Sequence, residues 1–259
     1  MRLLKENYEG LQEVNNLSAD LKAILLNPDI QELLKKNEFE TLYKKLPPDF
    51  VSDFTQLMAS LNIDPLNYLE YIPKSFLAFT SIEHLDIPNH ITRISDYAFR
   101  NCYELTDIII PNHVKRIGNF AFSNCRKLTS ITIPDRVKSI GEYAFSGCTG
   151  LISVIIGNSV TNIDDWAFYR CSGLKSITLP DNITNIGKAA FFDCAELTNI
   201  VIPNSVMSIG DNVFDRCISL NYINYKGTKD QWSKIKLESG WDNDLPINTI
   251  HCSDGDIKL

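Results

Sequence analysis

The sequence predicts an α+β fold in which an all-helical N-terminal region precedes a solenoid of stacked short parallel strands. Two observations predict this fold. Cysteines and apolar residues recur together with a period of 23 residues, and the cysteines stand at Cys102, Cys125, Cys148, Cys171, Cys194 and Cys217. A fixed period of this length is typical of a repeat architecture, in which each copy is one structural unit. Before residue 76, apolar residues recur at helical spacing instead, among frequent helix-start signals.

The chain is therefore expected to have three parts. These are a helical N-terminal region at 1–75, a solenoid of six 23-residue repeats at 76–225, and a C-terminal capping segment at 226–259. In the first part, polar N-cap residues and N1 prolines predict four or five short helices, with start signals at Ser18, Asn27 and Pro28, Pro48, and Asp64 and Pro65. We expect this region to cap the open end of the solenoid or to act as a separate docking element.

Each repeat is predicted to form one coil of the solenoid. In the second copy, Ile108 and Ile110 alternate with other residues, which indicates a short strand with one buried face. Pro111 ends this strand because it has no N–H to donate to a neighbouring strand. The return edge and an interior plug follow, formed by Val114, Ile117, Gly118, Ala121 and Phe122. One coil cannot close a core alone, so stacking is expected to bury these residues.

The cysteine column is predicted to be an interior ladder of free thiols. A free cysteine behaves as a small buried hydrophobe. Equivalent Cβ atoms in stacked coils point in parallel directions and not toward one another, which disfavours disulfide bonds. Redox chemistry is the alternative. Only Cys252 falls outside the 23-residue series.

The C-terminal segment is predicted to close the other end of the solenoid. Thr228 can cap a short helix that carries Trp232 and Ile235. The Asp254 and Gly255 pair is a hairpin signal, and with Trp241 this hairpin would seal the last coil.

The repeat has the form L-x-x-I-x-I-P-x-x-V-x-x-I-G-x-x-A-F-x-x-C and resembles the BspA-type leucine-rich repeat. That family is found in bacterial surface proteins, protozoan proteins and some phage-encoded proteins. The resemblance covers roughly Ile82 to Tyr225, and copies depart from it at Ser95, Gly157, Asp164 and Val213. It implies recognition of a protein or another ligand on the surface of a leucine-rich-repeat solenoid.

Composition and charge limit the classes of partner. The formal net charge is −7 and the isoelectric point is about 5.1, which predicts no nucleic-acid partner. No apolar run has the length of a signal peptide or a membrane span, so we expect a cytoplasmic protein without membrane insertion. Association with a cell surface or a virion is the alternative location.

No catalytic or cofactor motif is present in the sequence, which predicts no enzymatic activity, no cofactor and no metal. His90 and His113 occupy equivalent positions in adjacent copies, but no third metal ligand follows them. Glu142 and Asp165 are also equivalent and could form a glycosidase-like carboxylate pair, although a solvated acidic edge is favoured. Cys252 follows His251 directly, and adjacent residues of a strand point to opposite faces, which disfavours a catalytic dyad.

Two sets of residues are candidates for a binding surface. The first is a column of aromatic residues in four successive copies, at Tyr97, Phe120, Tyr143 and Trp166. Large aromatic side chains in a row are typical anchors of an interface, and the alternative is that these rings pack on one another between coils. The second set lies at outward positions of the predicted strands, and its candidates are Asp107, Ile109, Thr132 and Ile155.

The sequence thus predicts a protein-interaction module that presents a rigid repeat surface to a protein or peptide ligand. The small polar and β-branched residues of the strand surface suit such a ligand better than a phosphate-rich one. One alternative is a structural or assembly component, for example of a phage or particle, attached through the N-terminal helices. The other is a repeat-bearing effector enzyme.

Overall fold

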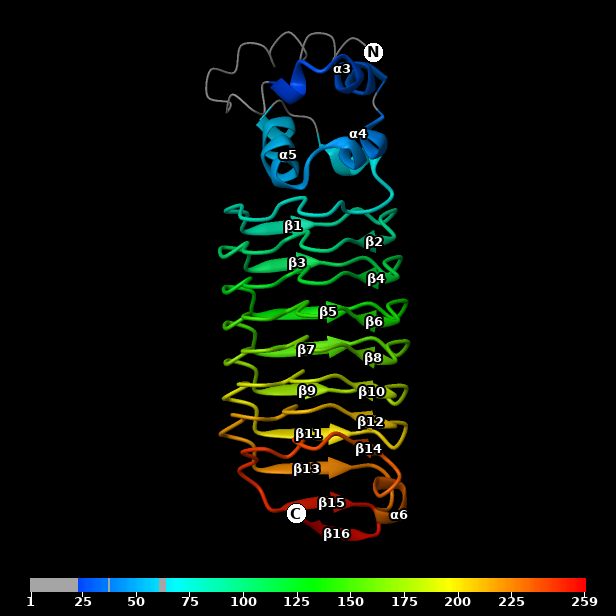
Figure 1. The fold of residues 1–259 in the computed structure, drawn as a ribbon, viewed down its shortest axis with the longest axis vertical. Helices are drawn as coiled ribbons and strands as arrows, with labels where there is room; N and C mark the ends of the chain where they lie inside the picture. The colour runs from blue at the N-terminus through cyan, green and yellow to red at the C-terminus, as the bar shows by residue number, and fades with distance from the viewer. Residues whose placement is uncertain (1–22, 37, 61–63) are drawn as a thin grey trace.

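The structure is a computed structural model that describes residues 23–36, 38–60 and 64–259. It has the predicted α+β architecture, with helices gathered at the N-terminal end of an elongated solenoid (Figure 1). After a helical turn at residues 23–25, the helices are α3 (Pro28–Lys36), α4 (Phe39–Lys45) and α5 (Val51–Ser60). Two 3₁₀ helices, η1 (Pro48–Phe50) and η2 (Pro65–Tyr68), complete the region.

Three helices begin at predicted start signals, whereas α4 begins after Glu38, which makes no side-chain cap and was not predicted as a start. α3, η1 and η2 each begin at a proline, whose missing N–H would have no partner in the first turn. The Asn27 side chain accepts a hydrogen bond from the N–H of Asp29 at 2.9 Å. The Asp64 side chain accepts one from the N–H of Leu66, also at 2.9 Å. The start predicted near Ser18 lies outside the described residues.

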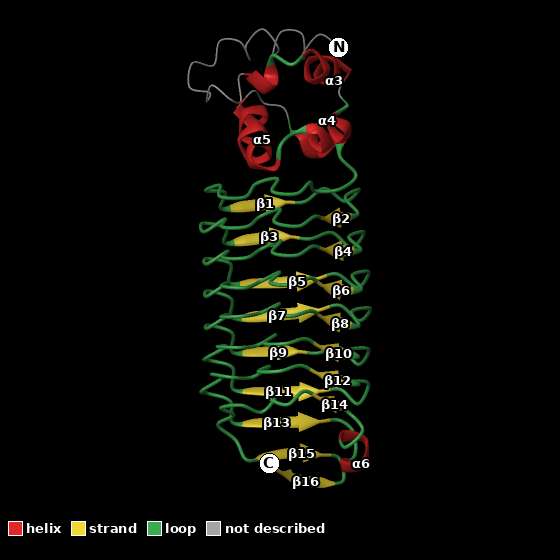
Figure 2. Ribbon diagram, viewed as in Figure 1, coloured by secondary structure: helices red, strands yellow, loops and turns green. Residues whose placement is uncertain are grey.

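Two columns of parallel strands run along the solenoid (Figure 2). In the first column, β1 (His84–Asp86) pairs with β3 (Asp107–Ile109). The same column continues as a seven-stranded sheet made of β5 (Ser130–Ile133), β7 (Ser153–Ile156), β9 (Ser176–Thr178), β11 (Asn199–Ile202), β13 (Tyr222–Tyr225), β15 (Thr249–Cys252) and β16 (Gly255–Lys258). The second column is β2 (Arg93–Ile94), β4 (Arg116–Ile117), β6 (Ser139–Ile140), β8 (Asn162–Ile163), β10 (Asn185–Ile186), β12 (Ser208–Ile209) and β14 (Lys236–Leu237).

The interior is built from side chains that repeat in every coil. Fully buried phenylalanines stack on one another along the solenoid, and neighbouring ring centroids are 5.1–5.8 Å apart from Phe99 to Phe214. The cysteines of the 23-residue series are all buried and free, as predicted. From Cys125 to Cys217, each thiol donates a hydrogen bond to the main-chain carbonyl of a phenylalanine 26 residues earlier, at 3.1–3.3 Å. The thiols therefore give these buried main-chain carbonyls of the preceding coil a hydrogen-bond donor.

The stacking continues on the N-terminal side of the six repeats. Ile72 forms a parallel bridge with Ile94, and it precedes Ile94 by 22 residues, one fewer than the repeat period. Thr80 stands in the place of a cysteine, and its hydroxyl lies 3.6 Å from the thiol of Cys102. Residues 70–80 thus form a degenerate half-coil that covers the first complete repeat. The sequence did not predict it.

The helical region packs directly on that half-coil. The ring of Tyr43 in α4 lies 5.6 Å from the ring of Phe76, and its hydroxyl hydrogen-bonds the hydroxyl of Thr55 at 2.8 Å. The Ser52 hydroxyl in α5 donates to the carbonyl of Ala78 at 2.7 Å. One buried apolar cluster runs from these helices into the solenoid. The helices thus cover apolar surface that the first coil would otherwise expose.

The C-terminal segment continues the strand columns and closes them. Helix α6 (Lys229–Trp232) has the predicted cap, because the Thr228 hydroxyl accepts from the N–H of Gln231 at 3.2 Å. The buried rings of Tyr225, Trp232 and Trp241 pack edge to face. β15 and β16 form the expected antiparallel hairpin at the end of the sheet, but its turn is at Ser253 and Asp254, one residue before the predicted pair, because Gly255 is the first residue of β16.

Candidate functional site

The outward residues of β1, β3 and the sheet from β5 to β16 form a surface that we name the β-face. Its central row is uncharged and β-branched, because Ile109, Thr132, Ile155 and Thr178 occupy equivalent positions in successive coils. Ile109 and Ile155 expose 57% and 63% of their surface. Beside them runs a row of serines at Ser130, Ser153 and Ser176, all exposed. The β-face therefore offers an apolar strip next to small hydroxyl side chains.

Charged and aromatic side chains lie at the two ends of the β-face. At the N-terminal end, the imidazole of His84 lies 3.3 Å from the carboxylate of Asp86 and 3.2 Å from that of Asp107. At the other end, the ring of His251 meets the edge of Tyr222 and its Nδ1 lies 2.8 Å from Asp256 Oδ1. Asp107, a predicted binding residue, is thus paired with a histidine, and Asp86 lies opposite Ile109 in the neighbouring strand. Ile155 lies between Thr132 and Thr178, away from these charges.

Two exposed apolar residues on or next to the strands of the β-face were not predicted. Ile152 comes directly before β7 and is 47% exposed, and Tyr222 in β13 is 41% exposed. In the two preceding copies, the position of Ile152 is held by Thr106 and Thr129. The signal that could have found Ile152 was therefore an isoleucine at a position that is threonine in neighbouring copies.

The aromatic column brings together all four of its predicted members. Successive ring centroids from Tyr97 through Phe120 and Tyr143 to Trp166 are 4.9, 4.6 and 4.9 Å apart. The ring planes are within 9° of parallel, so each inner ring is covered on both faces. The side chains are half-buried, and only the rims of the rings are left to contact another molecule.

The backbone explains why these rings align. Each of the four residues has a positive φ, between 52° and 61°. In this conformation its main-chain N–H donates to a carbonyl of the next coil, as from Tyr97 to Asn119 and from Trp166 to Lys188, both at 2.8 Å. The same bond recurs in successive coils, so the side chains leave the backbone in the same direction. Cations flank the ends of the column, with Lys74 Nζ 5.2 Å from the Tyr97 ring centroid and Lys188 Nζ 6.0 Å from that of Trp166.

The acidic column next to the rings has a structural role. Asp165 Oδ1 accepts a hydrogen bond from the N–H of Lys188 at 2.7 Å, and Asp96 accepts one from Asn119 at 2.9 Å. Asp164, which replaces a repeat glycine, is half-buried, and burial with the nearby charges of Asp165 and Glu142 raises its pKa. The carboxylates of Asp96 and Asp165 therefore link one coil to the next.

The other residues singled out for chemistry have neighbours that suit a structural role. The ring nitrogen Nε2 of His90 lies 2.9 Å from the carbonyl oxygen of Leu66. Within the described residues, no group of three His, Cys, Asp or Glu side chains is arranged to hold a metal ion. Cys252 packs against the core, and its burial raises its pKa, which disfavours the reactive thiolate. His251 turns toward Asp256.

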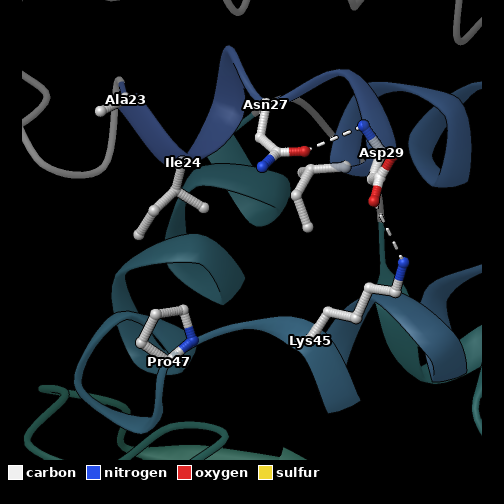
Figure 3. A pocket seen from close by; sticks show the side chains of 7 residues that line it. Ala23, Ile24, Asn27, Asp29, Lys45 and Pro47 are labelled. Carbon is white, nitrogen blue, oxygen red and sulfur yellow. Dashed lines mark hydrogen bonds and ion pairs between the residues drawn. The ribbon is translucent and has the colours of Figure 1, made fainter.

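A pocket of about 560 Å³ lies among the N-terminal helices (Figure 3). Its walls are Ala23, Ile24, Asn27, Asp29, Ile30, Lys45 and Pro47. Lys45 Nζ lies 3.7 Å from the carboxylate of Asp29, and the Asn27 side chain accepts a hydrogen bond from the N–H of Asp29. These polar groups are thus paired with one another within the wall of the pocket.

The family model of the BspA type leucine rich repeat region matches residues 70–195 and 115–236, with six copies. These ranges together cover more than half of the chain. The chain belongs to the BspA-type leucine-rich-repeat family. The match begins at residue 70, within the degenerate half-coil, and ends beyond β13. No relative among curated proteins matches the chain.

Two solved structures of bacterial leucine-rich repeat proteins share the fold. One from Eubacterium ventriosum is 23% identical with a TM-score of 0.59, and the match covers 73% of this chain and 50% of that chain. One from Bacteroides ovatus is 24% identical with a TM-score of 0.53, covering 72% of this chain and 54% of that chain. This BspA-type chain thus matches about half the length of either protein. A leucine rich cell surface protein from Faecalibacterium prausnitzii is 26% identical over 61% of this chain and 64% of that one, with a TM-score of 0.37.

The described helices are all too short or too polar to cross a membrane. Membership of a leucine-rich-repeat family is consistent with a scaffold for protein interaction. The cytoplasmic location inferred from the sequence stays a prediction.

Proposed function

We propose that this protein is an interaction module that binds an extended segment of a partner protein along the β-face, without a catalytic step. The observation that carries the proposal is the apolar strip at the centre of this face. Ile109 and Ile155 leave more than half of their surface in water, and Thr132 lies between them. Covering such side chains with a partner stabilises a complex because it removes apolar surface from water.

The chemistry of the β-face favours a protein ligand with apolar and β-branched side chains. The serine and threonine hydroxyls beside the strip can donate to main-chain carbonyls of a bound segment. The centre of the strip carries no charge, which suits a protein segment better than a phosphate-rich ligand. Asp107 and His84 at one end add a polar contact that can fix the direction of the segment.

We propose a packing role for the aromatic column. The faces of Phe120 and Tyr143 are already covered by neighbouring rings, so a partner would gain only rim contacts there. Anchor residues of interfaces usually insert accessible surface into a pocket of the partner. Tyr97, Phe120, Tyr143 and Trp166 would then hold the coils in register, while the strip at Ile109, Thr132 and Ile155 carries recognition.

A peptide-display selection on the full chain tests this proposal. Enriched peptides are titrated against the unchanged protein, against Ile155→Lys on the β-face, and against Met207→Lys as a matched control. Met207 is a 68% exposed apolar residue next to the second strand column, so its replacement changes charge and size in the same way. We expect Ile155→Lys to raise the Kd at least tenfold and Met207→Lys to leave it unchanged. Equal losses from both variants would reject the β-face as the binding surface.

A further inference from the structure

Among the described residues, no strand pairs with the outer edge of β16, which ends the long sheet. The strand order of that sheet begins at β16, and β16 lies at the lower end of the molecule beside β15 (Figure 1). A strand edge with unpaired N–H and C=O groups is a template for pairing with another chain. This edge lies beyond the apolar strip of the β-face, although the Asp256 side chain contacts His251 at the end of that face. The proposed function uses the strip and not the edge.

One hydrogen bond fixes which residues of β16 point outward. In an antiparallel pair, residues alternate between those whose N–H and C=O face the partner strand and those whose groups face away. The N–H of Leu259 donates to the carbonyl of Asn248 at 3.0 Å, at the end of the β15–β16 ladder. Leu259, Ile257 and Gly255 therefore face β15. It follows that Asp256 and Lys258 turn their N–H and C=O groups to the open edge.

These outward groups are free within the described part of the chain. The main-chain N–H and C=O groups of Asp256 and Lys258 form no hydrogen bond with any segment outside the hairpin there. The residues of β16 are exposed apart from the half-buried Ile257. The edge can therefore accept a strand without breaking any bond of the hairpin.

We propose that a second copy of this chain pairs with this edge, with the two β16 strands antiparallel about a two-fold axis at Ile257. In this register, Asp256 of one copy lies opposite Lys258 of the other, and the same contact repeats on the other side of the axis. Both residues direct their main-chain groups at each other, so each such pair exchanges two N–H···O bonds. An isologous contact of this kind closes as a dimer.

Charge favours this register over the other registers in which the outward N–H and C=O groups can form hydrogen bonds. The outward groups also meet when the axis passes through Asp256 or through Lys258. Those two registers place Asp256 opposite Asp256, or Lys258 opposite Lys258. Like charges directly opposite destabilise a strand pair, whereas opposite charges stabilise it. In the register centred on Asp256, Lys258 would also meet Asp254, but Asp254 lies in the turn before β16 and its carboxylate already accepts from the N–H of Lys229. Within β16, the sequence Asp-Ile-Lys is thus complementary to itself in one register only.

The side chains available at the edge agree with this pairing. Lys258 Nζ donates to the Thr249 hydroxyl at 2.9 Å and has no acidic partner among the described residues. Asp256 is about half exposed and contacts His251 through one oxygen, Oδ1. Its other oxygen can therefore accept from the ammonium of the second copy. The contact is short, so association is expected to be weak and concentration-dependent.

Sedimentation equilibrium on the full chain, from micromolar to about 1 mM protein, tests this inference. We expect the mass to rise from that of the 29.3 kDa chain toward twice that value. Asp256→Lys alone and Lys258→Asp alone should each raise the dimer dissociation constant at least tenfold, because both create like-charge pairs. An equimolar mixture of the two variants should dimerise again, and so should the Asp256→Lys/Lys258→Asp double variant.

Lys115→Asp is the control, because it reverses an exposed charge far from β16 and should leave dimerisation unchanged. Circular dichroism checks that each variant is folded. A chain that stays monomeric over the whole range overturns the inference, and so does a dimer that Asp256→Lys does not weaken. Loss in both single variants without recovery in the mixture and the double variant also overturns it, because misfolding or another occupant of the edge then explains the loss.

Discussion

The thiol of Cys148 donates a hydrogen bond to the main-chain carbonyl of Phe122, across 3.1 Å and from one coil to the coil before it. Cys148 is fully buried, and burial raises its pKa to about 12. The bond uses the neutral thiol as donor, so the thiolate would lose it and carry a buried charge. The cysteine column is therefore a structural element that depends on staying protonated.

Thiol labelling should distinguish the buried column from Cys252. In the folded protein, a thiol-reactive dye is expected to modify about one thiol per chain, because only Cys252 among the seven cysteines is not fully enclosed. The reaction should be slower than with a free thiol, because burial raises the pKa of Cys252. In denaturant, all seven should react. Rapid labelling of several thiols under native conditions would contradict the packing of the column. A Cys252→Ser variant identifies the reactive thiol.

The stability of the protein should fall in alkali because of the column. The folded-state pKa of Cys148 lies above its unfolded value, so the stabilisation from the neutral thiol is complete below about pH 9 and is lost as the pH rises toward 12. Each such thiol contributes a slope of at most about 1.4 kcal/mol per pH unit. We therefore expect Cys148→Ala to be less stable than the unchanged protein at pH 7, with a gap that shrinks between pH 9 and 11.

Urea denaturation at a series of pH values measures this gap. Comparing the two proteins at each pH cancels the titration of the lysines and tyrosines that both contain. A gap that is constant with pH would show that the thiol of Cys148 ionises equally easily in the folded and unfolded states.

Phe145→Ala should destabilise the protein by about 3 to 5 kcal/mol. The Phe145 ring is fully buried, with the rings of Phe122 and Phe168 at 5.2 and 5.3 Å. Neighbouring coils are fixed by their strand pairing and cannot collapse into the cavity. Chemical denaturation gives the free energy of unfolding. A loss below about 1 kcal/mol would mean that the plug position is loosely packed.

Tyr143→Ser tests the packing role of the aromatic column. It removes two stacked contacts, at 4.6 Å with Phe120 and 4.9 Å with Trp166, and should cost about 1 to 3 kcal/mol of stability. Ile155→Ser on the β-face is the matched control and should change stability by no more than about 0.5 kcal/mol. If Tyr143→Ser leaves stability unchanged but abolishes binding of a β-face ligand, recognition belongs to the column.

Much of the solenoid could be predicted because each copy must bury the same kinds of side chain at the same positions. Ile108, Phe122 and Cys125 occupy positions whose residue type repeats every 23 residues, and all three are buried. The half-coil at Ile72 was missed because a spacing of 22 and a threonine in the cysteine position hide the period. The half-coil is recognised from its pairing with the first repeat, and not from its own sequence.

The candidate site could be predicted only in part. Strand alternation placed Ile109 and Ile155 outward, and both are exposed. The same four aromatic residues would occur in an open ridge or in a closed stack, so only the ring distances distinguish the two. The hydrogen bond from Leu259 shows that the main-chain N–H and C=O groups of Asp256 and Lys258 face the open edge, and no residue pattern specifies this bond.

Site-specific photocrosslinking tests the central claim, recognition on the β-face, most directly. A photoreactive amino acid is placed at Ile155 in one protein and at Met207 in another, and both are irradiated with a selected peptide at its Kd. We expect a crosslinked product from position 155, lost when Ile109→Lys is added, and none above background from position 207. Crosslinking from 207 alone, or from both positions to the same extent, would contradict recognition on the β-face.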